Sequence, residues 1–195
     1  PYGGFVKAIT INSSDHIFAG TWGGGIFRST DNGDNWTEIN TGLINTYVQS
    51  IAVNSSDHIF AGTNSGGIFR STDNGDSWTE INTGLTDPNV VSFAINYSGY
   101  IFAGTNSGGI FRSTDNGDNW TEINTGLGNT FVRSLTINSS GYIFAGTWGG
   151  GIFRSTDNGD NWTEINTGLT NTYVQSIAVN SSGYIFAGTS GGGIF

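Results

Sequence analysis

The sequence contains no cysteine, no methionine and only two prolines among its 195 residues. Without cysteine, disulfide frameworks and thiolate metal sites are excluded, and cysteine usage cannot report the redox compartment. No apolar run approaches the roughly 18 residues that a membrane helix needs. We therefore expect no membrane insertion and a soluble mature chain, from which a cleaved leader could have been removed.

Basic residues are also scarce. Six of them face 15 acidic residues, which gives a formal net charge of −9. Binding to DNA, RNA or anionic lipid depends on clustered Lys and Arg that neutralise phosphate, so nucleic acid is not an expected partner. The basic residues are Lys7, Arg28, Arg70, Arg112, Arg133 and Arg154.

Glycine and aromatic residues are abundant instead, with 32 glycines and 13% aromatics. This composition is typical of many short strands joined by tight turns, and it favours an all-β class. No change of composition along the chain resembles a linker. We therefore expect a single domain over residues 1–195.

A nine-residue segment, Ile-Phe-Arg-Ser-Thr-Asp-Asn-Gly-Asp, recurs at a constant spacing of 42 residues. Its copies begin at Ile26, Ile68, Ile110 and Ile152. Residues 20–53 recur at residues 146–179 with one substitution, Ile44 by Thr170. Self-similarity at a fixed period indicates a repeat architecture, and the near identity suggests recent duplication.

Four short β-rich runs lie within each period, and we name them a, b, c and d. In the second period they cover residues 47–54, 58–63, 67–72 and 78–82. Turn segments such as Asn54-Ser-Ser-Asp57 and Asn138-Ser-Ser-Gly141 separate a from b, and glycine-rich segments separate b from c. Antiparallel hairpins are predicted.

Four antiparallel strands in a period of about 40 to 45 residues are typical of β-propeller blades. Strand b, for example residues 59–62, is apolar or small on both faces, as expected where blades stack face to face. Solenoids are the main competitor, but their repeats are shorter or helical. We predict blades over about 5–46, 47–88, 89–130, 131–172 and 173–195.

The fifth predicted blade is incomplete, because the chain contains five a runs but only four d runs. An open strand edge at Phe195 is a pairing hazard unless something covers it. A second copy, a continuation of the chain or closure of the propeller could each do so. The sequence does not choose between them, and the total blade number stays open.

Each complete period contains the pattern Ser-x-Asp-x-Gly-x-x-Trp. In such a turn the Asp side chain accepts bonds from backbone N–H groups, Gly adopts positive φ, and the Trp ring packs while its N–H finds an acceptor. The pattern residues are Ser29, Asp31, Gly33, Trp36; Ser71, Asp73, Gly75, Trp78; Ser113, Asp115, Gly117, Trp120; and Ser155, Asp157, Gly159, Trp162.

These residues resemble the Asp-box (BNR) repeat family, whose members include sialidases, other exo-acting glycosidases and sortilin-type receptors. The resemblance covers nearly the whole chain. It implies a propeller with a structural Asp box between the third and fourth strands, away from the ligand face. It also implies, for sialidase activity, an arginine triad that this chain lacks, since Arg28, Arg70, Arg112 and Arg154 occupy one repeating position.

A calcium site is the alternative interpretation of the Asp-box turn, because Asp31, Asn32 and Asp34 offer oxygen ligands. Three such groups fall short of the six to eight oxygens that calcium prefers, so we predict no metal and no cofactor. The glycine-rich segment 23–25 precedes a strand and not a helix, which argues against a phosphate cradle.

Candidate catalytic carboxylates are equally unconvincing. The Glu at position 38 repeats at 80, 122 and 164, and identical blades place such groups in like environments, whereas an acid–base pair needs unlike ones. Asp15 and Asp57 stand beside His16 and His58 in the a–b turns, where we interpret them as turn residues. Asp87 also breaks the repeat.

Ligand-binding candidates come from the face that carries the b–c and d–a loops, where the repeats vary. Trp22 and Trp148 occupy a b–c loop position that is Asn or Ser elsewhere. Exposed Trp beside polar groups suits stacking on a sugar ring or a partner side chain, and filling space over the next blade is the alternative. Equivalent positions of strand a, expected at a central channel, carry Lys7, Gln49, Val91, Arg133 and Gln175.

Three functions stay open on the sequence alone. The leading hypothesis is a non-catalytic, secreted or cell-surface bacterial propeller that binds a glycan or protein or serves as a scaffold. The second is a fragment of an exo-acting glycosidase or lyase, which would need two carboxylates about 5 to 10 Å apart on the variable face. The third is a structural array or filament subunit.

Overall fold

The structure, a computed structural model, describes residues 4–195 as 19 strands in five antiparallel sheets. Four sheets have four strands and the last has three, and in every sheet the strands neighbour one another in chain order. Each sheet is one blade, numbered 1 to 5 from the N-terminus. The predicted all-β class is confirmed, and none of the described residues forms a helix that could span a membrane.

The strands fall at the four predicted places of each period. The a strands are β1 (Gly4–Ile11), β5 (Val48–Val53), β9 (Val90–Ile95), β13 (Val132–Ile137) and β17 (Val174–Val179). The b strands are β2 (Ile17–Gly23), β6 (Ile59–Thr63), β10 (Ile101–Thr105), β14 (Ile143–Thr147) and β18 (Ile185–Thr189). The c strands are β3 (Gly25–Ser29), β7 (Ile68–Ser71), β11 (Ile110–Ser113), β15 (Gly151–Ser155) and β19 (Gly193–Ile194).

The d strands are shorter than the sequence suggests. They are β4 (Thr37–Glu38), β8 (Thr79–Glu80), β12 (Thr121–Glu122) and β16 (Thr163–Glu164). In blades 2 to 4 the Trp before each d strand bonds to the preceding blade: the Trp78 backbone N–H donates to Thr41 O at 2.9 Å. The run therefore joins two blades as well as completing one.

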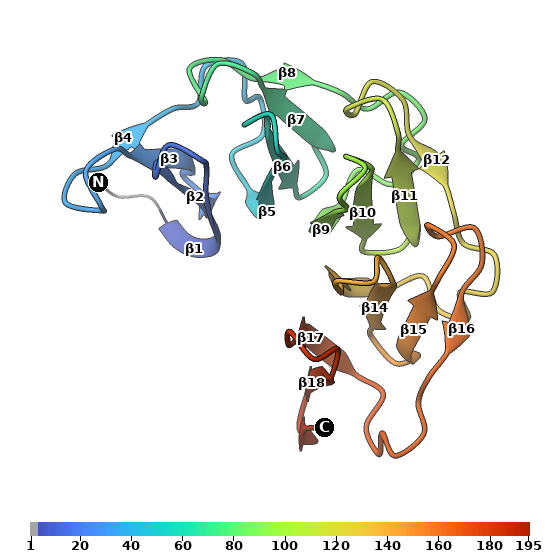
Figure 1. Cartoon of the computed structure of the whole chain (residues 1–195). Helices are drawn as coiled ribbons and strands as arrows, with labels where there is room; N and C mark the ends of the chain where they lie inside the picture. The colour runs from blue at the N-terminus through green and yellow to red at the C-terminus, as the bar shows by residue number, and fades with distance from the viewer. Residues whose placement is uncertain (1–3) are drawn as a thin grey trace.

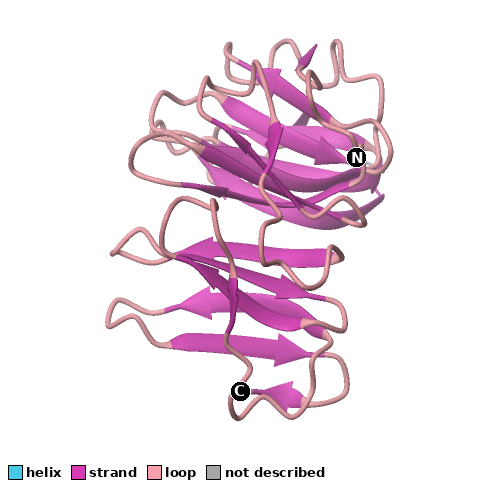
Figure 2. Ribbon diagram, turned by 90° about the vertical axis from the view of Figure 1, so that its right-hand side faces the viewer, coloured by secondary structure: helices cyan, strands magenta, loops and turns pink. Residues whose placement is uncertain are grey.

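The blades follow one another around an open arc (Figure 1), and successive sheets stack face to face (Figure 2). Strand b supplies both faces of each stack. Phe60 packs toward the blade that follows, whereas Ile59 and Ala61 pack toward the blade that precedes, and all three are fully buried. Period-2 alternation thus places one apolar set in each of two neighbouring interfaces.

Four apolar clusters fill the interfaces between blades. The cluster between blades 2 and 3 combines Phe60, Ile68 and Ile81 with Ile101 and Trp120 across the interface. At about 25 cal/mol per Å² of apolar surface buried, such burial is the main stabilising contribution to the arc.

Asp-box turns connect the c and d strands, as predicted. In the third blade Ser113 Oγ donates to Asp115 Oδ1 at 2.8 Å and accepts from Gly117 N at 2.8 Å, and Asp115 Oδ1 also accepts from Asn119 N. Gly117 has φ of 93° as expected, but Asn116 before it also has positive φ, 63°. An Asn-Gly pair with two positive φ values matches the tight type I′ turn.

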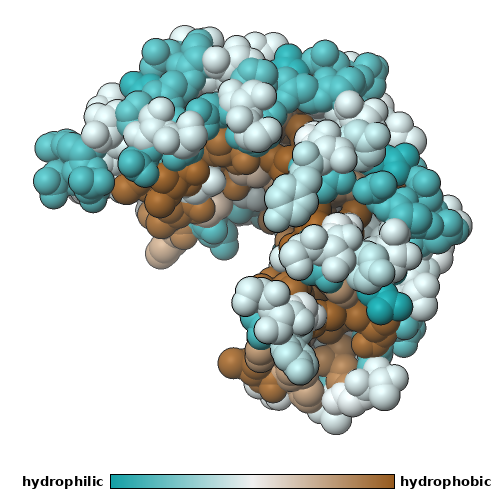
Figure 3. All heavy atoms as spheres, viewed as in Figure 1, coloured by the Kyte–Doolittle hydropathy of each residue, from teal (hydrophilic) through white to brown (hydrophobic). Residues whose placement is uncertain are grey.

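Among the described residues, two blade faces have no neighbouring blade, one at each end of the arc. On blade 1, side chains at positions equivalent to the interface residues of the other blades are open to solvent: Val6 is 56% and Ile9 64% exposed. Hydrophobic atoms gather on the inner side of the arc and toward both ends in Figure 3. The sheets of β1 and β17 lie at the two ends of the arc (Figure 1).

Candidate functional site

Two aromatic clusters lie on the face of the b–c loops, in the first and fourth blades. The Trp22 ring meets the Tyr47 ring of the next blade edge to face, with centroids 5.3 Å apart and planes at 74°. Trp148 and Tyr173 repeat this at 5.1 Å and 68°. Backbone bridges between Trp22 and Tyr47 and between Trp148 and Tyr173 hold each pair in place.

A cation completes each cluster. Lys7 Nζ lies 5.6 Å from the centroid of the Trp22 ring, and the Arg133 guanidinium carbon lies 5.5 Å from that of Trp148. Both distances are within the range of a cation–π contact, worth about 0.5–1 kcal/mol at exposed sites. The Arg133 Nε atom is buried and has no hydrogen-bond partner among the described residues.

A β-bulge in strand a positions these cations. Val6 pairs with Thr21 and Ala8 with Gly20, so Lys7 is the extra residue of β1. The same shift separates Val132 from Ser134 around Arg133. A bulge re-aims the side chain of its extra residue, which here brings it over the Trp of the same blade.

Gln49 and Gln175 occupy the same bulge position but belong to no cluster. Gln49 Nε2 donates to Asn89 Oδ1, so this side chain links blade 2 to blade 3. Gln175 is exposed on blade 5. The predicted site residues therefore divide into two separate clusters, Lys7 with Trp22 and Arg133 with Trp148, and two glutamines outside them.

The clusters combine packing and exposure. Trp22 and Trp148 are each half-buried, with a cation near the ring and the edge-to-face tyrosine of the next blade. Tyr47 and Tyr173 are 47% exposed. An aromatic surface held rigidly by a neighbouring blade can stack on a flat apolar face at little entropic cost.

The Asp-box turns serve the contacts between blades. Arg70 Nη1 donates to Asn116 O at 2.7 Å and to Asp118 Oδ1 at 2.8 Å in the next box. Arg28 and Arg112 make the same contact, each with an Asp in the Asp box of the next blade. The Trp78, Trp120 and Trp162 indole N–H groups donate to Ile39, Ile81 and Ile123 carbonyls of the preceding blades.

The box carboxylates bond within their own turns. Hydrogen bonds from Asn35, through its backbone and its side chain, and from Ser29 lower the pKa of Asp31. Ser77 lowers that of Asp73, and Asn119 and Asn161 lower those of Asp115 and Asp157. Within residues 4–195 no group of three His, Asp or Glu side chains could hold a metal ion.

The acidic residues that break the repeat have turn and loop partners. Asp15 and Asp57 both adopt positive φ, near 60°, and Asp57 accepts hydrogen bonds from Ser13 of the preceding blade, which lower its pKa. Asp87 is 9% exposed and accepts from Asn89 N, Ser107 N, Ser107 Oγ and Gly108 N. Burial alone would raise the pKa of Asp87, but these donors hold it below its ordinary value.

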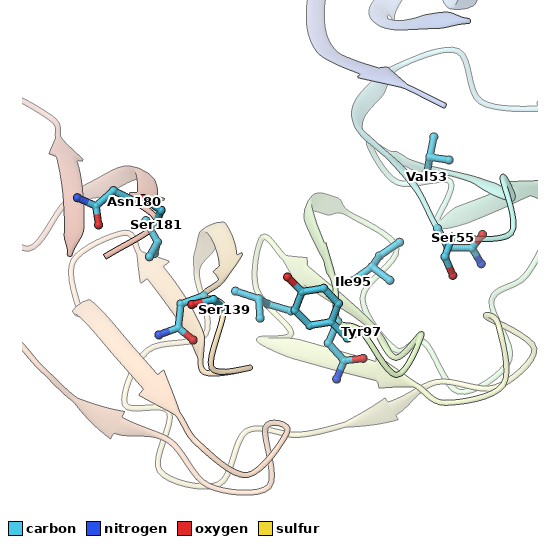
Figure 4. A pocket seen from close by; sticks show the side chains of 12 residues that line it. Val53, Ser55, Ile95, Tyr97, Ser139, Asn180 and Ser181 are labelled. Atoms are coloured by element: carbon cyan, nitrogen blue, oxygen red, sulfur yellow. The ribbon is translucent and has the colours of Figure 1, made fainter. Parts of the chain in front are cut away.

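A cavity of about 480 Å³ opens on the other face, that of the a–b turns (Figure 4). Its lining comes from the a–b turns of blades 2 to 5 and contains no acidic residue. Tyr97 is 91% exposed and lines this cavity at the position where the other three blades have Ser. This cavity was not predicted from the sequence, where the exchange of Ser for Tyr at position 97 is its only visible signal.

Comparison with known families agrees with this architecture. The sequence profile of the DUF6242 beta propeller domain matches residues 4–129 and again residues 44–184. The chain belongs to the DUF6242 β-propeller domain family. The two matches overlap, as expected where one repeat can align with its neighbour. The closer relation to Asp-box (BNR) proteins stays a resemblance carried by the turn.

Solved structures similar to this DUF6242 propeller include an ancestral GH74 enzyme, with 22% identity, a TM-score of 0.78, and coverage of 95% of this chain and 27% of that one. The extracellular domain of the hybrid two-component system BT4673 from B. thetaiotaomicron has 18% identity and a TM-score of 0.78, with coverage of 97% of this chain and 26% of that one. YCF48 bound to D1 peptide has 18% identity and a TM-score of 0.77, with coverage of 100% of this chain and 65% of that one. At such identities the likeness establishes the fold.

This DUF6242 propeller chain spans about a quarter of the GH74 and BT4673 structures and 65% of YCF48. A search of curated proteins found no match.

Proposed function

We propose that this chain is a non-catalytic, extracellular binding propeller whose b–c loop face holds a carbohydrate. The observation that carries the proposal is the pair of clusters, Trp22–Tyr47–Lys7 and Trp148–Tyr173–Arg133, each built across two blades. Sugar rings present flat C–H faces that stack on aromatic rings, and a neighbouring cation and polar groups bind hydroxyls or a carboxylate.

The geometry supports a ligand role beyond packing, because each tyrosine keeps nearly half of its surface open while its partner Trp holds it in place. The clusters occur in the first and fourth blades, whereas the b–c loops of the second and third carry Asn64 and Asn106. Two equivalent sites on one rigid arc favour a ligand with repeated units, since linked sites raise avidity.

An extracellular location is supported by the fold neighbours that are extracellular domains of bacterial two-component systems. Neither cluster includes an Asp or Glu among its contacting residues. The GH74 neighbours share the fold at identities too low to transfer their activity.

Glycan-array binding followed by calorimetry on the best ligand tests the proposal. We expect Trp22→Ala and Trp148→Ala each to weaken binding, and the double variant to weaken it by more than about tenfold. Tyr97→Ala is the matched control, because it removes an exposed aromatic ring from the opposite face. Thermal unfolding checks that each variant remains folded.

Absence of glycan binding by the wild-type chain would overturn the carbohydrate assignment. Equal affinities of wild type and the double variant would show that the ligand binds elsewhere. A loss of binding with Tyr97→Ala alone would place the site in the cavity on the face of the a–b turns.

A further inference from the structure

Lys7 and Arg133 differ from the other basic residues of the chain in their position. Four of the six basic residues occupy one repeating position in strand c, and three of these four bind an Asp of the next Asp box. Lys7 and Arg133 stand at the bulge of strand a in the two blades whose b–c loops carry Trp22 and Trp148. The three blades without this Trp have Gln or Val at the bulge. The cation therefore accompanies the Trp.

The face of the b–c and d–a loops contains little negative charge, although the chain has a net charge of −9. Each complete period places two Asp in its Asp-box turn and one Glu in its outer d strand, and Asp15 and Asp57 lie in a–b turns. Among the b–c and d–a loops of residues 4–195 only Asp87 is acidic, and it is 9% exposed and accepts four hydrogen bonds. An anionic ligand on this face meets cations and no exposed loop carboxylate.

Arg133 has donor groups available for such a ligand. It belongs to blade 4, which packs against blades 3 and 5, and it takes no part in the ion pairs of the described residues. Its Nε is buried without an acceptor, so the Nη groups are the donors that a ligand would reach. The Trp148 ring, 5.5 Å from the guanidinium carbon, attracts the charge. A guanidinium beside an aromatic ring still binds a carboxylate through paired N–H groups.

Tyr173 supplies an apolar surface next to this cation. Its side chain is 47% exposed, and so is that of Tyr47, which has the same place between blades 1 and 2. Because Tyr47 belongs to an interior blade, this exposure is a property of the repeat. The Trp148 ring meets Tyr173 edge to face at 5.1 Å and also lies beside Arg133. A short oligosaccharide can therefore contact both Tyr173 and Arg133.

We propose that the cluster of Arg133, Trp148 and Tyr173 selects sugars that bear a carboxylate, and that its ligand is a polyuronate; this rests on the carbohydrate site of the proposed function. A uronate ring stacks on Tyr173, and its carboxylate accepts hydrogen bonds from the Nη groups of Arg133. Guanidinium and carboxylate are both planar, and charge-assisted bonds are stronger than neutral ones. Lys7 offers a point charge in the other cluster and discriminates less by geometry.

Calorimetric titration of the 195-residue chain with oligomers of galacturonate, glucuronate and mannuronate tests the proposal. The methyl ester of the tightest ligand is the matched comparison, because it keeps the sugar rings and loses the charge. We expect the ester to bind at least about tenfold more weakly. Affinity for the acid should fall when NaCl is raised to about 1 M, because salt screens a partly exposed ion pair, whereas affinity for the ester should not.

Arg133→Gln should weaken binding of the acidic oligomer by at least about fivefold and leave binding of the ester within about twofold of wild type. Gln stands at the equivalent bulge of blades 2 and 5, so the fold accommodates this substitution. Arg133→Lys keeps the charge but loses the paired N–H groups, and should give an intermediate affinity. Arg154→Gln is the matched control, because it removes one positive charge from β15, outside both clusters.

Equal affinities for the acid and its ester would overturn the proposal, as would equal losses from Arg133→Gln and Arg154→Gln. Binding of neutral glycans alone would also overturn it and would leave the carbohydrate site of the proposed function intact. If no glycan of either kind binds, both proposals fall. A poly-Glu peptide that binds as tightly as the acidic oligomer would show that the cluster recognises charge without a sugar, which contradicts the uronate assignment.

Discussion

Trp36 and Trp120 hold the same place in their Asp boxes, but their surroundings differ. Trp120 is 4% exposed and donates its indole N–H to Ile81 O of the preceding blade at 2.8 Å. Among residues 4–195 no blade precedes that of Trp36, which is half-buried and donates its indole N–H to Gly33 O of its own turn at 3.0 Å. It lines a hollow of about 300 Å³ with Val6 and Ile9.

The difference shows that the contacts encoded in one blade form only where a neighbouring blade supplies the partner residues. An interior blade uses its two faces and its Asp box to bind both neighbours, whereas an end blade keeps the same residues with half of their partners. Stability in such an array is approximately the sum of each unit's own stability and its nearest-neighbour interfaces. Substitutions at equivalent positions should therefore have different costs in the middle and at the ends.

The largest expected difference concerns the Trp itself. Trp120→Ala removes a ring enclosed by two blades and should lower the free energy of unfolding by about 3–5 kcal/mol. Trp36→Ala removes a half-exposed ring and should cost about 1 kcal/mol or less. Urea unfolding followed by circular dichroism measures both, and equal losses would contradict the pairwise description.

A second comparison uses the position before strand a. Asp87 in the middle of the arc accepts four hydrogen bonds, whereas the equivalent Asn171 is half-buried, accepts one from Tyr173 N and donates to Ser190 O. Asp87→Ala leaves buried N–H groups without an acceptor and should cost about 1–3 kcal/mol. Asn171→Ala should cost less than about 1 kcal/mol. A larger loss from Asn171→Ala in chemical denaturation would reverse the comparison.

The pH dependence of stability tests the contribution of Asp87 further. Because the folded pKa of Asp87 lies below its ordinary value of 3.8, the carboxylate stabilises the fold above that value, and this contribution is lost as pH falls through the lower folded pKa. Asp87→Asn should lack this step, so its stability should approach that of wild type below about pH 4. A constant difference between the two from pH 7 to pH 3 would argue against an ionised Asp87 in the fold.

The smallest expected effect comes from the arginines. Arg70→Ala removes an ion pair with Asp118 and a bond to Asn116 O, and should cost about 0.5–1 kcal/mol. Arg154→Ala removes a side chain without a carboxylate partner among the described residues and should change stability little. Thermal unfolding at low and at 1 M salt measures both, and only the Arg70 effect should shrink in salt.

Much of the fold could be predicted from the sequence, because the 42-residue period is directly visible in it. The β-rich runs within each 42-residue period predicted four strands per blade and three in the fifth, and the resemblance to Asp-box repeats implied the turn between c and d. The partners of Trp78, Trp120 and Trp162 could not be predicted, since each indole donates to a carbonyl 39 residues away. No local pattern specifies such a contact.

The candidate site was predicted less well for a related reason. Trp22, Trp148, Lys7 and Arg133 were chosen because they vary between repeats, and they do lie together in two clusters. Their grouping depends on the β-bulge at Lys7 and Arg133, which leaves no mark in the residue pattern. Tyr47 and Tyr173 were overlooked, because they sit at a position that is aromatic in four of the five repeats and so looked like strand packing.

The constant offset of the contacts between blades affects how the chain finds its fold. Arg28, Arg70 and Arg112 all reach an Asp 48 residues further on, so any blade face would fit the complementary face of any other. Discrimination between correct and incorrect neighbours then comes from the short connections alone, through the high effective concentration of the adjacent blade. Excising one whole period would leave two matching faces in contact, and the chain would refold as a shorter arc with no mismatched interface.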